Sequence, residues 1–263
     1  MIDPGAVGAG TRLVLADAIY FKGAWKKPFI GDPTRDRPFH IVGGGSKNLP
    51  TMYHQFGVDD VGYREADLPN GGGSLQILAL PYRIAGSASD TKGDNISFVV
   101  LLPGADDGLA ALEKSLTAEM FKEWLGALAA PRFEVETYLP KFTLRGDYGL
   151  FGALKTLGMK DAFLEPPPAP GSAAGADFSG MNGAHDLFIS EVLHQTYLEV
   201  KEQGTEAAAA TVVIAPTNAM ATSGGPPPPP TIIFRADHPF LFLICDNATG
   251  AILFMGRFSS PTE

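Results

Sequence analysis

Apolar runs of strand length recur along most of the chain. Leu13–Phe21 alternates too little for a half-exposed strand and predicts a central strand buried on both faces. Ile96–Leu102 predicts a further buried strand. Shorter strands bounded by glycine-rich turns are predicted at Phe39–Val42, Asn48–Tyr53, Gly62–Ala66 and Leu75–Leu80. This spacing is typical of antiparallel β-structure.

Helices are few in the predicted pattern. Leu109–Leu128 carries apolar residues at helical spacing, and Gly149–Leu157 predicts a short helix that ends at Gly158. Further strands are predicted at Arg132–Leu144, Ile189–Val200 and Thr231–Ile244. The chain of 263 residues is therefore expected to form one large α+β domain over residues 1–263.

The segment that follows Ile189–Val200 has conflicting local preferences. Glu202 to Thr205 form a polar hinge, Ala207–Ala210 favour helix, and Thr211–Ile214 are all β-branched and favour strand. Read with a period of two, one face of a strand would carry only small or β-branched side chains: Thr205, Ala207, Ala209, Thr211 and Val213. Such a face can enter a crowded sheet.

The end of this loop has a different composition. Thr217–Gly225 is small and polar, and Pro226–Pro230 is a polyproline II spacer that cannot pair in a central strand. The tip is therefore expected to be accessible to proteases.

Several blocks of sequence resemble the serpins, a family of serine protease inhibitors. EQGTEAAAAT resembles the inhibitory hinge, FRADHPFLFLICDNATGAILFMGRF the C-terminal signature, and LVLADAIYFKGAWKKPF with LPTMY the central strand and the turn after it. The resemblance implies a serpin fold, with a multi-sheet antiparallel core, few helices, and an exposed reactive-centre loop over residues 202–230 that carries a proline-rich extension. Measured against the family pattern, the chain is expected to be truncated at its N-terminus and to lack the first helices.

Composition excludes several other classes of protein. The net charge is −9 and no basic cluster is present, which argues against nucleic acid as a partner. The longest apolar runs are strand-sized, so no membrane span is expected. Cys245 is the single cysteine and cannot form an internal disulfide; its apolar surroundings predict a core position.

No enzyme motif is found. The GGGSK segment at Gly43 lacks the spacing of a phosphate loop, and His185 with Asp186 is expected to be a solvated loop pair. The five histidines are dispersed, so no metal site, cofactor or catalytic residue is predicted and the protein is not expected to be an enzyme.

The resemblance also implies roles for individual residues. Asp17 and His194 match two positions that meet beneath the main sheet where it parts, with aspartate in place of the usual asparagine, so a buried carboxylate is expected beside the imidazole. Trp25 matches the tryptophan at the top of that sheet, and Glu202 with Lys141 match a pair that ties the hinge to a neighbouring strand. The simpler interpretations are a satisfied core histidine, core burial and an ordinary surface ion pair.

The hinge and the cleaved bond are assigned in the same way. The implied hinge residues are Glu202, Gly204, Thr205, Glu206, Ala207, Ala208, Ala209, Ala210 and Thr211. Counting the family's usual span from Gly204 places the reactive bond at Asn218–Ala219, with Met220 as the alternative. Asparagine would suit an asparagine-cleaving cysteine protease, whereas methionine or alanine would suit elastase-like or subtilisin-like enzymes.

The resemblance thus implies a metastable, monomeric inhibitor that traps a serine or cysteine protease as an acyl-enzyme by inserting its cleaved loop into the main sheet. The alternatives are a non-inhibitory serpin, acting as a carrier or chaperone, and an inactive fragment. The small residues of the hinge argue against the non-inhibitory class. The family resemblance implies an extracellular location, although the compartment cannot be read from the sequence itself.

Overall fold

The computed structural model describes residues 7–30, 32–83, 96–126, 128, 133–165, 175–205 and 230–260. The chain divides into two compact units. Unit 1 comprises Met1–Phe21 and Thr143–Leu198, and unit 2 comprises Lys22–Phe142 and Glu199–Glu263. The single domain expected from the sequence stays a prediction.

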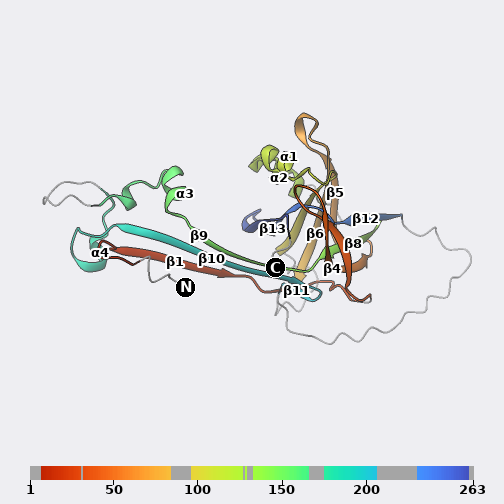
Figure 1. Cartoon of the computed structure of the whole chain (residues 1–263), viewed down its shortest axis with the longest axis horizontal. Coiled ribbons are helices and arrows are strands. Elements are labelled where there is room, and N and C mark those ends of the chain that lie inside the picture. The colour runs from red at the N-terminus through yellow and green to blue at the C-terminus, as the bar shows by residue number, and fades with distance from the viewer. Residues whose placement is uncertain are drawn as a thin grey trace, which may run out of the picture. The chain divides into compact units, whose positions relative to one another are not determined.

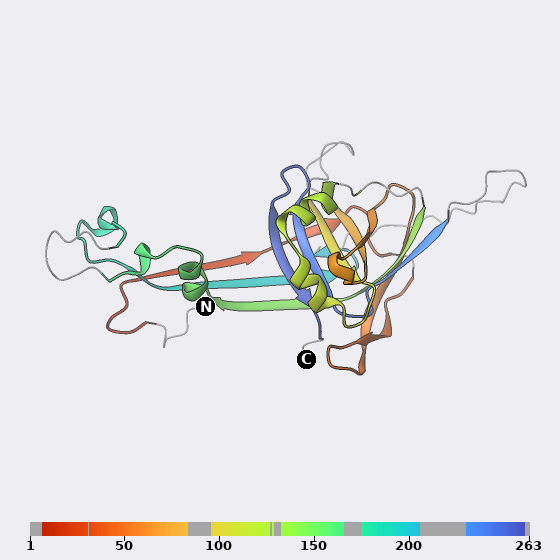
Figure 2. The same cartoon turned by 90° about the horizontal axis from the view of Figure 1, so that it is seen from above.

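Unit 1 is built on long strands that run side by side in both views (Figure 1 and Figure 2). β1 (Leu13–Tyr20) pairs in parallel with β10 (Ile189–Lys201), from Leu13 opposite Ile189 to Tyr20 opposite Tyr197. β9 (Phe142–Gly149) also pairs with β10. The remaining elements of unit 1 are the short helices α3 (Phe151–Thr156), η3 (Asp161–Phe163) and α4 (Ser179–Asn182).

Unit 2 contains the larger sheets. One has the order β11-β2-β6-β7-β13-β14, with β5 also paired to β6; the other has the order β12-β8-β4-β3. The strands of the first are β2 (Gly23–Trp25), β5 (Gly62–Asp67), β6 (Ser74–Arg83), β7 (Ile96–Pro103), β11 (Gly204–Thr205), β13 (Phe240–Asp246) and β14 (Ile252–Phe258). Those of the second are β3 (Arg35–His40), β4 (Ser46–Phe56), β8 (Glu134–Pro140) and β12 (Thr231–Arg235). The helical elements are η2 (Pro69–Gly71), α1 (Leu109–Ser115) and α2 (Ala118–Gly126).

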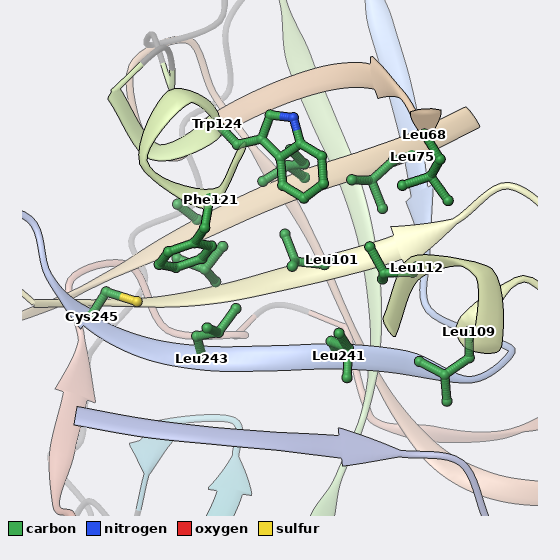
Figure 3. Packing of buried hydrophobic residues seen from close by; sticks show 13 residues of the cluster. Leu68, Leu75, Leu101, Leu109, Leu112, Phe121, Trp124, Leu241, Leu243 and Cys245 are labelled. Carbon is green, nitrogen blue, oxygen red and sulfur yellow. The ribbon is translucent and has the colours of Figure 1, made fainter. Parts of the chain in front are cut away.

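The main core of unit 2 lies between the strands β6, β7 and β13 and the helices α1 and α2 (Figure 3). Alternate residues of each strand face the helices, as the period of two requires; Leu75, Leu101 and Leu243 are each at most 1% exposed. Trp124 of α2 covers them. Cys245 is buried in the same cluster, as expected, and burial raises the pKa of its thiol to about 12.

The expected burial of the first strand on both faces is wrong. β1 has the predicted bounds to within one residue, yet Leu15 is 42% exposed and Tyr20 is 50% exposed. Within the described residues, β1 pairs only with β10 and lies at the edge of the sheet. An apolar strand is buried only where neighbouring elements cover it. One edge of β1 is unpaired within the described residues, and most of its residues are exposed.

Three predicted elements are each divided in two because the chain changes partners within them. The helix Leu109–Leu128 breaks at Leu116, whose ψ of 119° is extended, and the Thr117 hydroxyl then accepts the N–H of Met120 to begin α2. The strand Arg132–Leu144 becomes β8, which pairs with β4, and β9, which pairs with β10.

The strand Thr231–Ile244 is likewise divided. β12 pairs with β8, whereas β13 pairs with β7 and β14. Pro239, which has no N–H to donate, lies in the connection. The sheets are also not purely antiparallel as expected: β1 with β10 and β12 with β8 are parallel pairs, because long crossover connections separate their strands in the sequence.

Candidate functional site

The polar hinge predicted from the sequence begins as a short strand inside a sheet of unit 2. After β10 the chain turns at Glu202 and Gln203 and returns as β11, antiparallel to the end of β10. On its other side β11 pairs antiparallel with β2, with Gly204 opposite Ala24 and Thr205 opposite Gly23. Gly204 and Thr205 therefore already occupy a position between two strands.

Gly204 is required by the close approach of the backbones. Its φ of 143° lies in the region that side chains rarely adopt. A Cβ atom there would lie 2.1 Å from the carbonyl oxygen of Gly23 and 2.7 Å from the Cα of Ala24. No side chain fits at this position.

Trp25 lies directly beside this strand and is 1% exposed. Its indole N–H donates to the carbonyl of Lys201 at 2.8 Å, and its backbone N–H donates to the carbonyl of Gln203 at 2.9 Å. The indole stacks on Tyr82 with ring centroids 4.5 Å apart, and Phe98 meets it edge-on. Trp25 thus binds both sides of the turn at Glu202, where the hinge begins.

Thr205 is fully buried, and its hydroxyl oxygen lies 2.7 Å from the phenol oxygen of Tyr82; either hydroxyl can donate. Burial raises the pKa of Tyr82 far above its ordinary value, against the smaller lowering effect of the Thr205 hydrogen bond, so the phenol is neutral. The sequence analysis did not single out Tyr82. The available signal was a polar aromatic residue near the end of the mostly apolar strand LQILALPYR.

Glu202 and Lys141 meet as the resemblance implies, with 3.0 Å between carboxylate and ammonium. The hydroxyl of Thr34, which the sequence analysis missed, also donates to this carboxylate. Partial burial alone would raise the pKa of Glu202, but the Thr34 and Lys141 contacts outweigh burial and hold it below the ordinary value.

Asp17 and His194 also meet, within unit 1. They are register partners on β1 and β10, and the imidazole Nδ1 lies 3.1 Å from the carboxylate. The carboxylate is 65% exposed and the imidazole 22% exposed. The sequence analysis expected a buried carboxylate, and that expectation is wrong because the face of β1 that carries Asp17 is open to solvent.

The rest of the predicted loop lies outside the described residues. This applies to the hinge residues Glu206, Ala207, Ala208, Ala209, Ala210 and Thr211. It applies equally to Asn218, Ala219 and Met220, the residues assigned to the cleaved bond.

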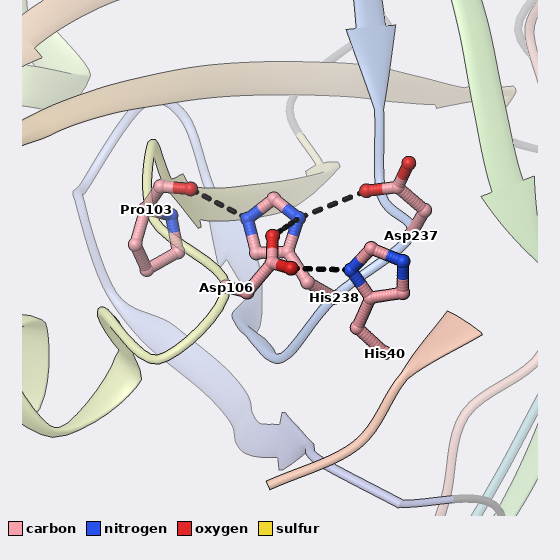
Figure 4. Close-up of polar contacts among 5 residues, drawn as sticks. All are labelled: His40, Pro103, Asp106, Asp237 and His238. Atoms are coloured by element: carbon pink, nitrogen blue, oxygen red, sulfur yellow. Dashed lines mark hydrogen bonds and ion pairs between the residues drawn. The ribbon is translucent and has the colours of Figure 1, made fainter. Parts of the chain in front are cut away.

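A second polar cluster, absent from the sequence analysis, surrounds His238 in unit 2 (Figure 4). One imidazole nitrogen lies 2.6 Å from the carbonyl of Pro103, and the other lies 2.9 Å from Asp237 and 3.9 Å from Asp106, which also contacts His40. Acceptors at both nitrogens favour the imidazolium. Burial opposes that charge, but these contacts outweigh burial and raise the pKa of His238, while the imidazolium lowers that of Asp237 against its own burial.

This cluster borders a hollow of about 680 Å³, whose rim includes the glycine turn Gly43–Gly45. Among the described residues, no three His, Cys, Asp or Glu side chains are grouped so that they could hold a metal ion. The exposed His185 contacts Asp177 at 3.2 Å. In the same described parts of the chain, no helix has the length and apolar character that crossing a membrane requires.

Comparison with known proteins identifies the family. The family model described as "Serpin (serine protease inhibitor)" matches residues 1–261. The chain belongs to the serpin family. This serpin is 40% identical to the human (Homo sapiens) leukocyte elastase inhibitor, and the match covers 99% of this chain and 62% of that relative. It is 37% identical to human serpin B3, with 99% of this chain and 59% of that relative covered.

Solved structures agree with this assignment. The crystal structure of native protease nexin-1 with heparin matches with a TM-score of 0.73 at 29% identity, over 99% of this chain and 59% of that chain. Uncleaved ovalbumin matches with a TM-score of 0.71 at 31% identity, over 99% and 57%. The serpin fold expected from the sequence is confirmed. The chain spans about three fifths of the length of these relatives, and none of these comparisons supports the extracellular location that the resemblance implied.

Proposed function

We propose that this serpin inhibits a serine or cysteine protease as a suicide substrate. The protease nucleophile attacks the carbonyl before the cleaved bond, the amine side of the loop leaves, and an ester or thioester joins the protease to the loop. The freed hinge then inserts into the main sheet and displaces the protease. The observation that carries this proposal is the position of Gly204 and Thr205 between β10 and β2.

Strand direction favours continued insertion. β11 runs antiparallel to both of its neighbours, whereas β1 and β10 form a parallel pair. A hinge that continued from Thr205 between β10 and β1 would replace the parallel β1–β10 pairing with two antiparallel pairings. Antiparallel pairs are the more stable per residue, and about ten additional hydrogen bonds at roughly 1 kcal/mol each would release on the order of 10 kcal/mol.

Several contacts would then oppose premature insertion. The Asp17–His194 contact crosses the β1–β10 pair that must separate, and the Glu202–Lys141 pair holds the start of the hinge. Trp25 fixes both sides of the turn at Glu202. We assign these residues the roles of closing the sheet and guiding the hinge.

The inserting segment proposed here runs from Glu202 to Thr211 within a reactive-centre loop of residues 202–230 in a single domain. The proposed cleaved bond is Asn218–Ala219, with Met220 as the alternative. A relative named leukocyte elastase inhibitor supports an elastase-like target, which alanine or methionine at the cleaved bond would suit. The inhibitor itself needs no catalytic group, so we propose that it is not an enzyme and acts as a monomer on its protease partner.

The proposal is tested by incubating the protein with elastase-like, subtilisin-like and asparagine-cleaving proteases and separating the products on denaturing gels. We expect a covalent complex of combined mass with at least one protease. Ala207→Arg is the matched variant, because a charged residue on the inward face stalls insertion and the variant should be cleaved without being trapped. Cleavage of the parent without any complex would instead assign it to the non-inhibitory serpins or to inactive fragments.

A further inference from the structure

We infer that Tyr82 is a positioning residue for loop insertion, and that its hydroxyl sets the register in which the hinge enters the sheet by bonding Thr205. This inference rests on the proposed inhibitory function. It adds to that function a residue outside the hinge that decides whether a cleaved loop traps its protease.

The register of three strands places the two hydroxyls on one face of the sheet. Tyr82 on β6 is opposite Trp25 on β2, and Thr205 on β11 is opposite Gly23 on β2. Trp25 and Gly23 are two residues apart and share a face, so Tyr82 and Thr205 lie on that face as well. Because glycine at 23 has no side chain, β2 leaves space for the phenol of Tyr82 to reach across to Thr205.

The position of the phenol is fixed independently of the hinge. Tyr82 is 2% exposed, and its ring lies nearly parallel to the Trp25 indole with an interplanar angle of 16°. The indole is in turn held by its hydrogen bond to Lys201. The Tyr82 hydroxyl therefore presents a fixed partner, and the Thr205 hydroxyl lies 2.7 Å from it at the point from which the hinge would continue.

A fixed hydrogen-bond partner distinguishes the correct register from registers shifted by one residue. A slip of one residue turns every side chain of a strand to the opposite face. It would remove the Thr205 hydroxyl from Tyr82 and bring the side chain of Gln203 or Glu206 to a fully buried position. Gly204 adds a steric requirement, since only glycine fits against Gly23 and Ala24. Together the two contacts specify one register at the point where insertion starts.

Register matters because insertion competes with hydrolysis. Water attacks the acyl-enzyme and releases active protease and a cleaved inhibitor with a free carboxylate. A hinge that slips out of the register held by Gly204 and Thr205 must return to it before insertion can continue, and this delay favours hydrolysis. Loss of the Tyr82 hydroxyl should therefore raise the number of inhibitor molecules consumed for each protease molecule trapped.

The test uses Tyr82→Phe, Thr205→Val and the double variant in the full chain, with Tyr63→Phe as the matched control. Tyr63 is also buried in unit 2, and its hydroxyl donates to Glu65 at 2.7 Å, away from the hinge. We expect a roughly three- to tenfold rise in the consumption ratio for either single variant, no further rise in the double variant, and no change for the control. Thr205→Ser should restore a ratio near that of the parent.

The outcomes separate the two proposals. A parent that forms complexes, with an unchanged ratio in both Tyr82→Phe and Thr205→Val, overturns the role of Tyr82 and leaves the inhibitory function intact. Additive effects in the double variant also overturn it, because the two hydroxyls would then act separately. A parent that is cleaved but forms no complex overturns the inhibitory function, and the role of Tyr82 falls with it.

Discussion

The apolar strands β7 and β1 have opposite surroundings. β7 lies between β6 and β13 in unit 2, and Phe98 to Leu101 are completely buried. β1 in unit 1 has β10 as its one paired neighbour within the described chain, and most of its residues are exposed. The two strands therefore contribute differently to the stability of the fold. β7 cannot leave its place without opening the core of unit 2, whereas β1 has one paired neighbour and mostly exposed residues.

This contrast agrees with the proposed insertion, in which one sheet region would part and another would stay closed. Few buried contacts and a solvent-facing polar pair mark β1 as a region of low local stability. The dense layer of β6, β7 and β13 provides the fixed frame against which Trp25 and Tyr82 hold the hinge.

The largest expected effect is a test of this contrast by matched truncation. Leu101→Ala in β7 removes a fully buried side chain and should lower the free energy of unfolding by about 2–5 kcal/mol. Leu15→Ala in β1, at a position 42% exposed, should cost less than about 1 kcal/mol. Urea titration of both variants measures this difference, and equal costs would contradict it.

A charge at the start of the hinge should abolish trapping of the protease. Thr205→Arg places a cation at a fully buried position, which costs several kcal/mol if the cation stays unpaired. We expect loss of complex formation on denaturing gels without any change in the site of cleavage. Retained trapping would contradict the position assigned to the hinge.

The Glu202 carboxylate should make the free energy of unfolding depend on pH in the acidic range. Because its folded pKa lies below its unfolded value, its contribution is present above the unfolded pKa and is lost as pH falls through the folded pKa. Glu202→Gln should flatten the acid limb of a plot of unfolding free energy between about pH 3 and about pH 7. Glu123→Gln is the control, since that carboxylate is 69% exposed in its pair with Arg64. Equal acid limbs in both variants would contradict this prediction.

His238 should change the free energy of unfolding with pH in the opposite direction. Its folded pKa is raised, so its contribution is complete below the unfolded pKa of about 6.5 and is lost as pH rises through the folded pKa. Asp237→Asn removes a carboxylate that faces the imidazole and should reduce this alkaline decline, leaving Asp106 and the Pro103 carbonyl as its acceptors. The free energy of unfolding is measured on either side of neutral pH, with His185→Gln at an exposed position as the control. An unchanged alkaline decline in Asp237→Asn would contradict this prediction.

The smallest effect is expected at Asp17. With its carboxylate 65% exposed, Asp17→Asn should change the free energy of unfolding by less than about 1 kcal/mol. The rate of insertion of an added hinge peptide should rise in this variant, because the contact that crosses the β1–β10 pair is weakened. Identical insertion rates for parent and variant would show that the pair does not restrain the sheet.

Much of this serpin was predictable from local pattern. The strands of LVLADAIY and SFVVLLP were predicted at nearly their observed bounds, because strand length and apolar content are local properties. The exposure of β1 was not predictable, because it depends on which segments lie against it. The breaks at Leu116, Lys141 and Asp237 were missed for a related reason, since each marks a change of packing or strand partner.

The candidate site was predicted unevenly. Family resemblance gave the contacts Glu202–Lys141 and Asp17–His194, and both pairs meet. Tyr82 and Thr34 were missed, because single polar residues in ordinary strands and loops carry no periodic signal. Their importance follows only from the register that brings them to Thr205 and Glu202.

The most direct test of the central claim is the melting temperature before and after one cut between residues 206 and 229, with the two pieces kept together. Insertion that releases on the order of 10 kcal/mol should raise the melting temperature by about 20 °C or more. Thr205→Arg, cut in the same way, should show little of this rise. A cut parent that melts where the uncut parent melts would contradict the claim that the hinge inserts beyond Thr205.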